Sequence, residues 1–381
     1  MSFPFLARLT GKTASPPPAG LLPPRFMFME VNKRCNLKCT HCDFWLRDDR
    51  DRANYLSRDR KREIIAEFAR MSPHGSLVIC GGEPMLDLKE YFAMCRDARA
   101  HGLRVLSVVN GTRIRDAAMA DRMVLEGPHE ISVSLNSHDP AIHNATRGVR
   151  TAFDKAVKAL RLLTEARDRH RQARSRIVVM GLIFRSNYRL VEEFYDFVLN
   201  DIGADNLKLN FVQPSFGRGG VVDDFFENEG ELDSAELARL IDRCDERFNL
   251  GLNPVWKENV AMYFRSLART RDREKGWASQ NGTTDRICNS FDRNLMVDHY
   301  GTVRLCFSTG FPGRKLERPG DLEDFWYTAE FIRTRMRKCN QFCGISHSVR
   351  AQSSTIEGQA KKDTFEAVSG DLVRPRETGK V

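Results

Sequence analysis

The sequence of 381 residues lacks an apolar run long enough to cross a membrane. Its first residues, MSFPFLAR, also lack the charged region and apolar core that mark a secretory signal. Ten cysteines in such a chain are expected to stay reduced, which favours metal ligation over disulfides. The composition, 41% apolar and 29% charged, is that of a globular protein. We therefore expect a cytoplasmic chain with no membrane partner.

The charge pattern lacks the features of a nucleic-acid platform. The chain has 60 basic and 51 acidic residues, a net charge of +9. Much of the excess lies in 161–176, where basic residues are not interleaved with aromatic ones. This segment is typical of a solvated helix face. The charge therefore predicts no nucleic-acid partner and indicates at most a preference for an acidic substrate.

Strand-like and helix-like segments alternate about six times along the chain. We expect strands near 26–31, 76–80, 103–109, 130–135, 176–184 and 206–212. We expect helices near 58–71, 87–101, 113–126, 151–170, 188–201 and 233–248. This alternation predicts an α/β fold with a parallel sheet that curves into a partial TIM-like (β/α)6 barrel. In such folds the site lies at the carboxyl ends of the strands.

Composition changes along the chain predict five regions. They are a Pro-rich lead-in over 1–24, a barrel over 25–230, a helical linker over 231–283, a small cysteine-containing domain over 284–347 and a polar tail over 348–381.

Three cysteines stand close together after the first expected strand. Cys35, Cys39 and Cys42 have the spacing CxxxCxxC. Three thiolates on one loop can hold three irons of a cubane iron–sulfur cluster and leave the fourth iron without a protein ligand. A metal site that does chemistry needs such an open coordination position. Taken alone, the spacing also suits a zinc knuckle, but no fourth ligand stands at zinc-finger spacing.

Companion segments follow the next strands and make the sequence similar to the radical S-adenosylmethionine (radical SAM) superfamily. The second strand ends in Gly81-Gly82-Glu83-Pro84, the third in Asn110-Gly111-Thr112, and the fourth in Ser134-Leu135-Asn136. Arg147 and Asn187 also match the family pattern. The resemblance implies that S-adenosylmethionine is bound by Gly81, Gly82, Glu83, Pro84, Asn110, Ser134, Asn136 and Arg147.

The resemblance also implies the reaction. S-adenosylmethionine would chelate the open iron of a 4Fe–4S cluster held by Cys35, Cys39 and Cys42. A flavodoxin- or ferredoxin-like donor would supply one electron. The 5′-deoxyadenosyl radical so formed would take a hydrogen atom from the substrate, while the protein orients the groups and excludes solvent.

Four further cysteines resemble the twitch and SPASM extensions of this family. Cys288, Gly301 and Cys306 match the spacing CX(9–15)GX4C, and Cys339 and Cys343 follow. With four cysteines, the shorter twitch type with one auxiliary 4Fe–4S cluster is the better match. A four-cysteine zinc site is the alternative. The remaining cysteines, Cys80, Cys95 and Cys244, are expected to be small buried hydrophobes.

An auxiliary cluster would serve as an electron sink for substrate oxidation, which then needs a base. The candidates for this base are His299, Asp298, Asp223 and Asp224. The candidates for substrate contact near the fifth and sixth strands are Arg185, Lys208, Asn210 and Gln213.

We expect an oxidoreductase-like enzyme acting on a small polar metabolite, such as a sugar or aminocyclitol. The short segment before Cys35 favours this over a peptide-modifying maturase, because it has no room for a leader-recognition domain. A non-catalytic, zinc-stabilised scaffold is the third alternative.

Overall fold

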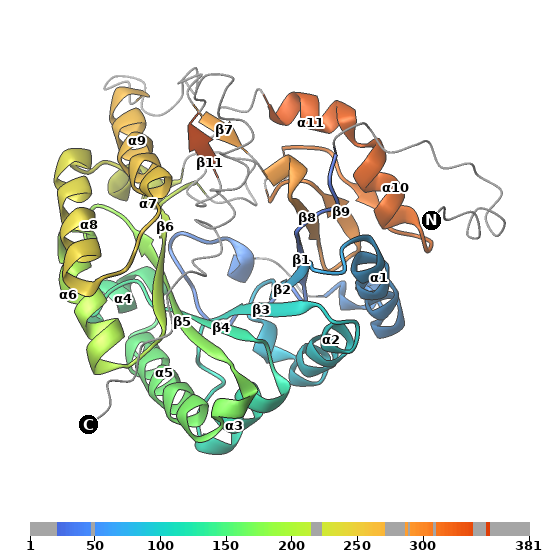
Figure 1. Cartoon of the computed structure of the whole chain (residues 1–381), viewed down its shortest axis with the longest axis horizontal. Helices are drawn as coiled ribbons and strands as arrows, with labels where there is room; N and C mark the ends of the chain where they lie inside the picture. The colour runs from blue at the N-terminus through green and yellow to red at the C-terminus, as the bar shows by residue number, and fades with distance from the viewer. Residues whose placement is uncertain are drawn as a thin grey trace.

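The computed structural model describes residues 21–46, 50–214, 223–270, 286–288, 290–307, 310–337 and 348–350. Over these residues, one curved sheet of nine strands forms the centre of the molecule, in the order β10-β9-β8-β1-β2-β3-β4-β5-β6 (Figure 1). Its strands are β1 Phe26–Glu30, β2 Ser76–Cys80, β3 Arg104–Val109, β4 Glu130–Ser134, β5 Arg176–Ile183, β6 Asn206–Phe211, β8 Asn294–Val297, β9 Thr302–Arg304 and β10 Arg314–Lys315.

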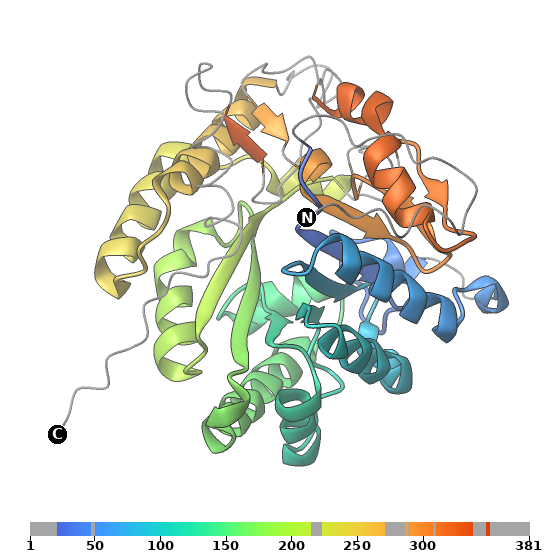
Figure 2. The ribbon, with the colours of Figure 1, turned by 45° about the vertical axis from the view of Figure 1, so that its right-hand side comes forward.

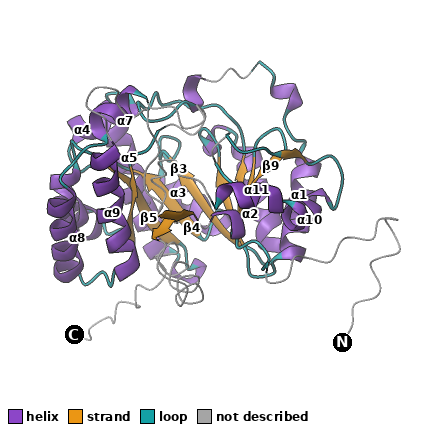
Figure 3. Cartoon of the chain, turned by 90° about the horizontal axis from the view of Figure 1, so that it is seen from above, coloured by secondary structure: helices purple, strands orange, loops and turns teal. Residues whose placement is uncertain are grey.

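Helices cover the outer side of this sheet, as the turned view in Figure 2 shows. They are α1 Arg58–Met71, α2 Leu88–Ala100, α3 Ala117–Glu126, α4 Pro140–Arg147, α5 Ala152–Arg169, α6 Val191–Asp196, α7 Asp224–Glu229, α8 Ser234–Phe248, α9 Pro254–Thr270, α10 Asp321–Thr328 and α11 Glu330–Met336. Seen from above, the strands lie between helices on both sides (Figure 3). The expected α/β fold with a parallel, barrel-like sheet is confirmed.

Side-chain alternation gives the sheet two different faces. Odd-numbered positions of the first strands, such as Met27 and Leu77, are fully buried in the core shared with the helices. Even-numbered positions point to the inner, concave side, and the register Glu30↔Cys80 places these two side chains next to each other there. The site therefore forms on the inner face and at the carboxyl ends of the strands.

All six expected barrel strands are present, but some helices differ from the expectation. The helix expected at 113–126 begins only at Ala117, because the Asp116 side chain accepts the Met119 N–H as an N-cap. The segment 188–201 is broken into a 3-10 turn, α6 and a π-helix over Phe197–Asp201. Helix α4, capped by Asp139, was not expected at all.

The C-terminal strands join the barrel sheet. β8 pairs with β1 in parallel, and β9 pairs with β8 antiparallel. Residues 348–350, expected in the polar tail, form β11, which pairs with β7 (Arg286–Cys288). The separate auxiliary domain stays a prediction, and residues 1–20 of the lead-in lie outside the described residues.

Within the described part of the chain, no helix has both the length and the apolar character needed to cross a bilayer.

Candidate functional site

The loop after β1 is held by backbone contacts with the turn after β2. The Gly82 N–H donates to the Asn32 carbonyl at 2.9 Å, and the Glu83 N–H donates to the Arg34 carbonyl at 2.6 Å. A Cβ atom on Gly82 would lie 1.9 Å from the Arg34 carbonyl oxygen. Only glycine permits this approach, so Gly82 fixes the position of the loop that carries Cys35.

The three cysteines of this loop gather around one apolar cluster. Cys39 is buried with Leu37 and Ala152, and Cys35 and Cys42 pack against the same cluster. The chain is held there by the Lys38 N–H, which donates to the Arg147 carbonyl at 3.1 Å. The three cysteines thus pack against one cluster in the structure, and their role as ligands of an iron–sulfur cluster stays a prediction.

The grouping of these thiols bears on the kind of metal site that they could form. No three cysteine, histidine or acidic side chains of the described ranges are grouped tightly enough for one metal ion. A single zinc ion draws its thiolates to about 2.3 Å from the metal, whereas the irons of a cubane stand apart. Burial raises the pKa of Cys35 to about 11 and that of Cys42 to about 12. Cation binding would have to release those protons.

Glu83 links the turns after β2 and β3. Its carboxylate accepts the Met85 N–H at 3.0 Å and the Asn110 N–H at 2.7 Å, and its side chain is buried. Burial raises the pKa of Glu83 to about 7, while these two hydrogen bonds and Arg113 and Arg147 oppose the shift. Glu83 therefore has a positioning role within the predicted GGEP segment.

Asn110 ties the third strand to the cysteine loop. Its Nδ2 donates to Asn36 Oδ1 at 2.9 Å, and Asn36 Nδ2 donates to Thr112 Oγ1 at 2.8 Å. Asn36 lies between the cysteines of the motif, and sequence reasoning gave it no role. The signal for Asn110 was the Asn-Gly-Thr turn directly after the strand, but nothing in the sequence pointed to its partner.

Arg147 and Asn136 form a buried pair beside Cys39. Arg147 Nη2 donates to Asn136 Oδ1 at 3.1 Å, Nη1 lies 3.7 Å from Cys39 Sγ, and Nε has no protein partner. Asn136 Nδ2 donates to Thr146 Oγ1 at 3.0 Å. Asn136 is therefore occupied in holding α4, while Arg147 keeps a free donor next to the cysteines.

Asn187 joins the ends of β4 and β5. Its Nδ2 donates to the carbonyls of Asn136 at 2.6 Å and Leu182 at 2.7 Å, and its Oδ1 accepts the Phe184 N–H at 2.9 Å. Ser134, the last residue of β4, is half-buried on the inner face. The predicted contacts of these residues with S-adenosylmethionine stay predictions.

His299 differs from the other candidate bases in its surroundings. It is buried, its Nδ1 lies 2.6 Å from Glu30 Oε2, its Nε2 has no protein partner, and the Tyr55 ring lies 4.8 Å from it. Glu30 ends β1 on the inner face, beside Cys80. Sequence reasoning missed Glu30, although an acidic residue after an apolar strand was a visible signal.

The aspartate candidates have local structural roles. Asp298 accepts the N–H groups of Tyr300 and Thr302 and pairs with Arg304 at 2.8 Å, so it shapes the turn between β8 and β9. Asp223 caps α7 by accepting the Phe226 N–H at 2.9 Å, and Asp224 is exposed on the first turn of that helix. Phe225, the neighbour of Asp224 on α7, has its ring 5.6 Å from the His41 ring of the cysteine loop, and the role of these carboxylates as a base stays a prediction.

The candidate substrate contacts have different surroundings, and their contact with substrate stays a prediction. Arg185 is exposed. Lys208 donates to buried Glu130 at 2.6 Å, and Glu130 also pairs with Arg104 and Arg176. Asn210 Nδ2 lies 3.3 Å from Met180 Sδ, and Gln213 follows β6. Lys208 thus belongs to a cluster of charged side chains that joins β3, β4, β5 and β6.

The structure describes only two of the four expected auxiliary cysteines. Cys306 is half-buried just after β9, and the backbone of Cys288 ends β7. Cys339 and Cys343 lie outside the described residues. The auxiliary cluster therefore stays a prediction. Cys95 and Cys244 are buried as expected, while Cys80 is half-buried.

Comparison with known proteins gives three relevant likenesses. The chain is 32% identical over 142 residues to the AdoMet-dependent heme synthase of Nitratidesulfovibrio vulgaris. These residues make up 36% of this chain and 36% of the heme synthase. It is 29% identical over 150 residues to the PqqA peptide cyclase of Granulibacter bethesdensis, 38% of this chain and 37% of that one. The matches span little more than a third of these relatives.

The third likeness is structural. Streptococcus suis SuiB bound to its precursor peptide SuiA shares 16% sequence identity with this chain and has a TM-score of 0.58, over 84% of this chain and 70% of SuiB. At this low sequence identity, the similarity shows that the two chains share a fold and nothing more.

The family comparison covers the part of the chain that carries the site. Residues 29–198 match the model of the radical SAM superfamily, and this range includes the cysteine loop, the GGEP turn, Asn136 and Arg147. Over this range, which is less than half of its length, the chain matches the radical SAM superfamily.

Proposed function

We propose that this protein is an enzyme that cleaves S-adenosylmethionine reductively and takes a hydrogen atom from a substrate on the inner face of the barrel. The single observation that carries the proposal is the convergence of Cys35, Cys39 and Cys42 on one buried cluster beside the GGEP turn and Arg147. Cys35, Cys39 and Cys42 would hold a 4Fe–4S cluster, which would supply the electron for the reductive cleavage of S-adenosylmethionine.

The residues of the chain orient the groups and keep water away. Leu37 and Ala152 form an apolar wall at Cys39, so the thiol is out of solvent. The free Nε of Arg147 is a charged donor suited to a carboxylate near the cysteines. The close backbone contact between Gly82 and Arg34 fixes the cysteine loop against the GGEP turn. The loop and the turn therefore keep their relative position during turnover.

The relatives favour a different substrate class from the sugar or aminocyclitol expected from the sequence. By their names, one of the relatives described above makes heme, one cyclises the PqqA peptide, and SuiB binds the precursor peptide SuiA. The names of the peptide cyclase and of SuiB support the peptide-modifying alternative. We therefore propose a peptide substrate, with a tetrapyrrole as the second candidate because of the heme synthase likeness. The cytoplasmic location stays a prediction.

The proposal is tested by one substitution with a matched control. Under anaerobic conditions and with dithionite, the wild-type protein should bind iron and form 5′-deoxyadenosine. Cys39→Ser should lose cluster iron and the 5′-deoxyadenosine product, because the loop then has only two thiolates. Cys244→Ser makes the same change on α8, away from the loop, and should keep both. Product formation by Cys39→Ser would refute the site.

The substrate class needs a separate measurement. Mass spectrometry of the reduced, S-adenosylmethionine-supplied reaction would be run with a peptide set, a tetrapyrrole set and a sugar set. We expect loss of hydrogen atoms or a new cross-link in the peptide set. Turnover confined to the sugar set would restore the original expectation.

A further inference from the structure

A buried histidine and a buried glutamate meet at the carboxyl end of β1. His299 is 3% exposed, Glu30 is 5% exposed, and His299 Nδ1 lies 2.6 Å from Glu30 Oε2. Glu30 is the last residue of β1, and Cys80 is its neighbour in register on the inner face. His299 comes from the turn between β8 and β9, 269 residues away in the chain. Two distant segments thus place this pair at the end of the strand that the cysteine loop follows.

The contact with Glu30 decides which ring nitrogen of His299 carries the hydrogen. A carboxylate only accepts hydrogen bonds, so the Nδ1–H group of the ring is the donor. Nε2 then keeps its lone pair and is an acceptor. Among the residues that the structure describes, this buried Nε2 has no hydrogen-bond partner. Such an acceptor is rare inside a folded protein and calls for an explanation.

Aromatic rings hold the imidazole in a fixed orientation. The ring centroid of Tyr55 lies 4.8 Å from that of His299 in an edge contact, and the centroid of Tyr300 lies 4.1 Å away. Tyr300 is itself held, because its hydroxyl is bonded to Asp51 and accepts from Lys33 Nζ at 2.8 Å. Both tyrosines are half-buried. The imidazole therefore lies directly beneath side chains that reach the surface.

A structural role accounts for Nδ1 and for the backbone of His299, but not for Nε2. The His299 carbonyl accepts the Leu56 N–H at 2.9 Å, and Nδ1 donates to Glu30. An asparagine would supply the same side-chain donor without leaving an unused acceptor. The second nitrogen of the ring therefore suits a hydrogen donor that is not part of the described chain.

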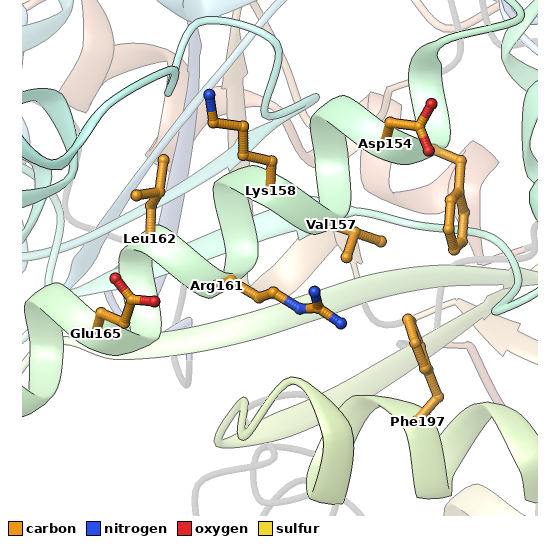
Figure 4. A pocket seen from close by; sticks show the side chains of 8 residues that line it. Asp154, Val157, Lys158, Arg161, Leu162, Glu165 and Phe197 are labelled. Atoms are coloured by element: carbon orange, nitrogen blue, oxygen red, sulfur yellow. The ribbon is translucent and has the colours of Figure 1, made fainter.

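A groove on the outer side of the barrel offers no acceptor of this kind. It lies along α5 beside Phe197 and has a volume of about 470 Å³. Figure 4 shows that its charged side chains, such as Lys158 and Arg161, come from α5. Its lining residues include no histidine or cysteine. The pair of His299 and Glu30 is therefore the better candidate for chemistry on the substrate.

We propose that His299 is a catalytic residue that accepts a proton from the substrate, and that Glu30 is its positioning residue. The inference rests on the proposed function, because it concerns the substrate that loses a hydrogen atom on the inner face. The donor is an N–H, O–H or S–H group bonded to the carbon atom that loses this hydrogen atom. A peptide offers such groups in its backbone amides and in serine, threonine and cysteine side chains.

The step is a proton transfer and needs no oxidant. The bond between the substrate heteroatom and its hydrogen breaks, a bond between this hydrogen and Nε2 forms, and the electron pair stays on the heteroatom. The ring gains a positive charge, which faces the Glu30 carboxylate. The electron-rich heteroatom weakens the neighbouring C–H bond, so the hydrogen atom is removed more easily. A positioned base of this type typically contributes about 10²- to 10⁴-fold to the rate.

The substitution His299→Asn separates catalysis from structure. Its side-chain N–H group can replace Nδ1–H as the donor to Glu30, but it has no atom at the position of Nε2. We expect this variant to keep the wild-type urea midpoint and to form 5′-deoxyadenosine with dithionite. Product formation from the peptide set should fall about 100-fold. The control His101→Asn changes an exposed histidine at the end of α2 and should behave like the wild type.

Two further variants test the pair itself. His299→Ala also removes the bond to Glu30, so it should lower the urea midpoint, and added imidazole should restore part of its product formation. Glu30→Gln keeps an oxygen that accepts from Nδ1–H but loses the charge. For a peptide that turns over, this variant should have a lower kcat with an unchanged KM, because Glu30 acts through His299 and does not touch the substrate.

Nitrogen-15 NMR of the full chain with labelled histidine gives a readout that needs no turnover. Comparison with His299→Asn assigns the signals of the His299 ring. At a pH where the ring is neutral, we expect hydrogen on Nδ1 and none on Nε2. Hydrogen on Nε2 would overturn the proposal, and so would product formation by His299→Asn at the wild-type rate. If His299→Asn is as unstable as His299→Ala, a lack of rescue by imidazole would overturn it.

The outcomes separate this inference from the function on which it rests. If the wild type forms no 5′-deoxyadenosine even with dithionite, the proposed function fails, whatever the NMR spectrum shows. If dithionite supports the reaction and His299→Asn forms product like the wild type, only the role of His299 is wrong.

Discussion

Asn187 shows how much one amide contributes to the site. It donates to two carbonyls and accepts one N–H, and it is buried where β4 and β5 end. Its donors hold the carbonyl of Asn136, whose side chain in turn holds Arg147. A residue far from the cysteines in sequence therefore positions the charged group beside Cys39.

We predict that two substitutions of Asn187 destabilise the protein to different extents. Asn187→Ala removes the side-chain partner of two buried backbone groups, the Asn136 carbonyl and the Phe184 N–H, and of the part-buried Leu182 carbonyl, at a cost of about 1–3 kcal/mol for each group left unsatisfied. Asn187→Asp keeps the shape but places a carboxylate against the carbonyls of Asn136 and Leu182, so it should lower the urea midpoint at least as much. Asn200→Ala removes an exposed amide bonded to Asp196 and is the control. A midpoint of Asn187→Asp close to that of the wild type would contradict this reading.

At the residue level, the sequence predicted which residues gather but not how they are used. The strand-end positions of Glu83, Asn110 and Asn136 follow from the motifs. Asn110 has partners 27 and 74 residues away in the chain, Glu83 and Asn36, and no local pattern encodes such pairings. The partners of Asn136, Thr146 and Arg147, are 10 and 11 residues away. Asp223 was a candidate base because it is acidic, and in the structure its carboxylate caps α7.

Four strands of the barrel are joined by a charge cluster on its inner face. Glu130 on β4 is buried and lies 2.6 Å from Lys208 on β6, 3.2 Å from Arg104 on β3 and 3.6 Å from Arg176 on β5. A single carboxylate thus attracts three cations that repel one another, and so it joins the four strands.

We predict that Glu130→Ala lowers the free energy of unfolding by about 3–5 kcal/mol, as expected when one partner of a buried ion pair is lost. The control is Glu126→Ala on α3, where the exposed pair with Arg122 should be worth about 0.3–0.5 kcal/mol. Urea unfolding followed by circular dichroism measures both. Similar losses in the two variants would show that the cluster on the inner face adds nothing beyond an ordinary surface pair.

Strands were easier to predict than helices here, for a physical reason. The barrel strands are short apolar runs bounded by turns, so β2 was expected and found at 76–80. Helix α4 has only eight residues and begins at Pro140, so it shows too few turns for a periodic pattern. The segment after Tyr188 changes from α6 to a π-helix, and the periodicity of 3.6 residues does not reveal such a change.

At the scale of the whole molecule, the C-terminal part closes onto the barrel at β1. β8 pairs with β1, and His299 reaches Glu30 at the end of that strand. The Leu56 N–H also donates to the His299 carbonyl at 2.9 Å, so the segment after the cysteine loop covers this junction. Sequence reasoning placed a domain boundary at 284 because the composition changes there, and composition carries no information on strand pairing between distant segments.

This closure places Cys306 next to the barrel, and its substitution tests the auxiliary site. If Cys288, Cys306, Cys339 and Cys343 hold a second 4Fe–4S cluster, Cys306→Ser should about halve the iron and sulfide content per chain. Formation of 5′-deoxyadenosine with dithionite should continue, because Cys35, Cys39 and Cys42 are untouched, while product formation from substrate should be lost. Cys95→Ser, a buried position on α2, should keep the full iron content. A variant that loses zinc instead of iron would identify the alternative zinc site, and one that keeps full turnover would exclude an electron-accepting role for this site.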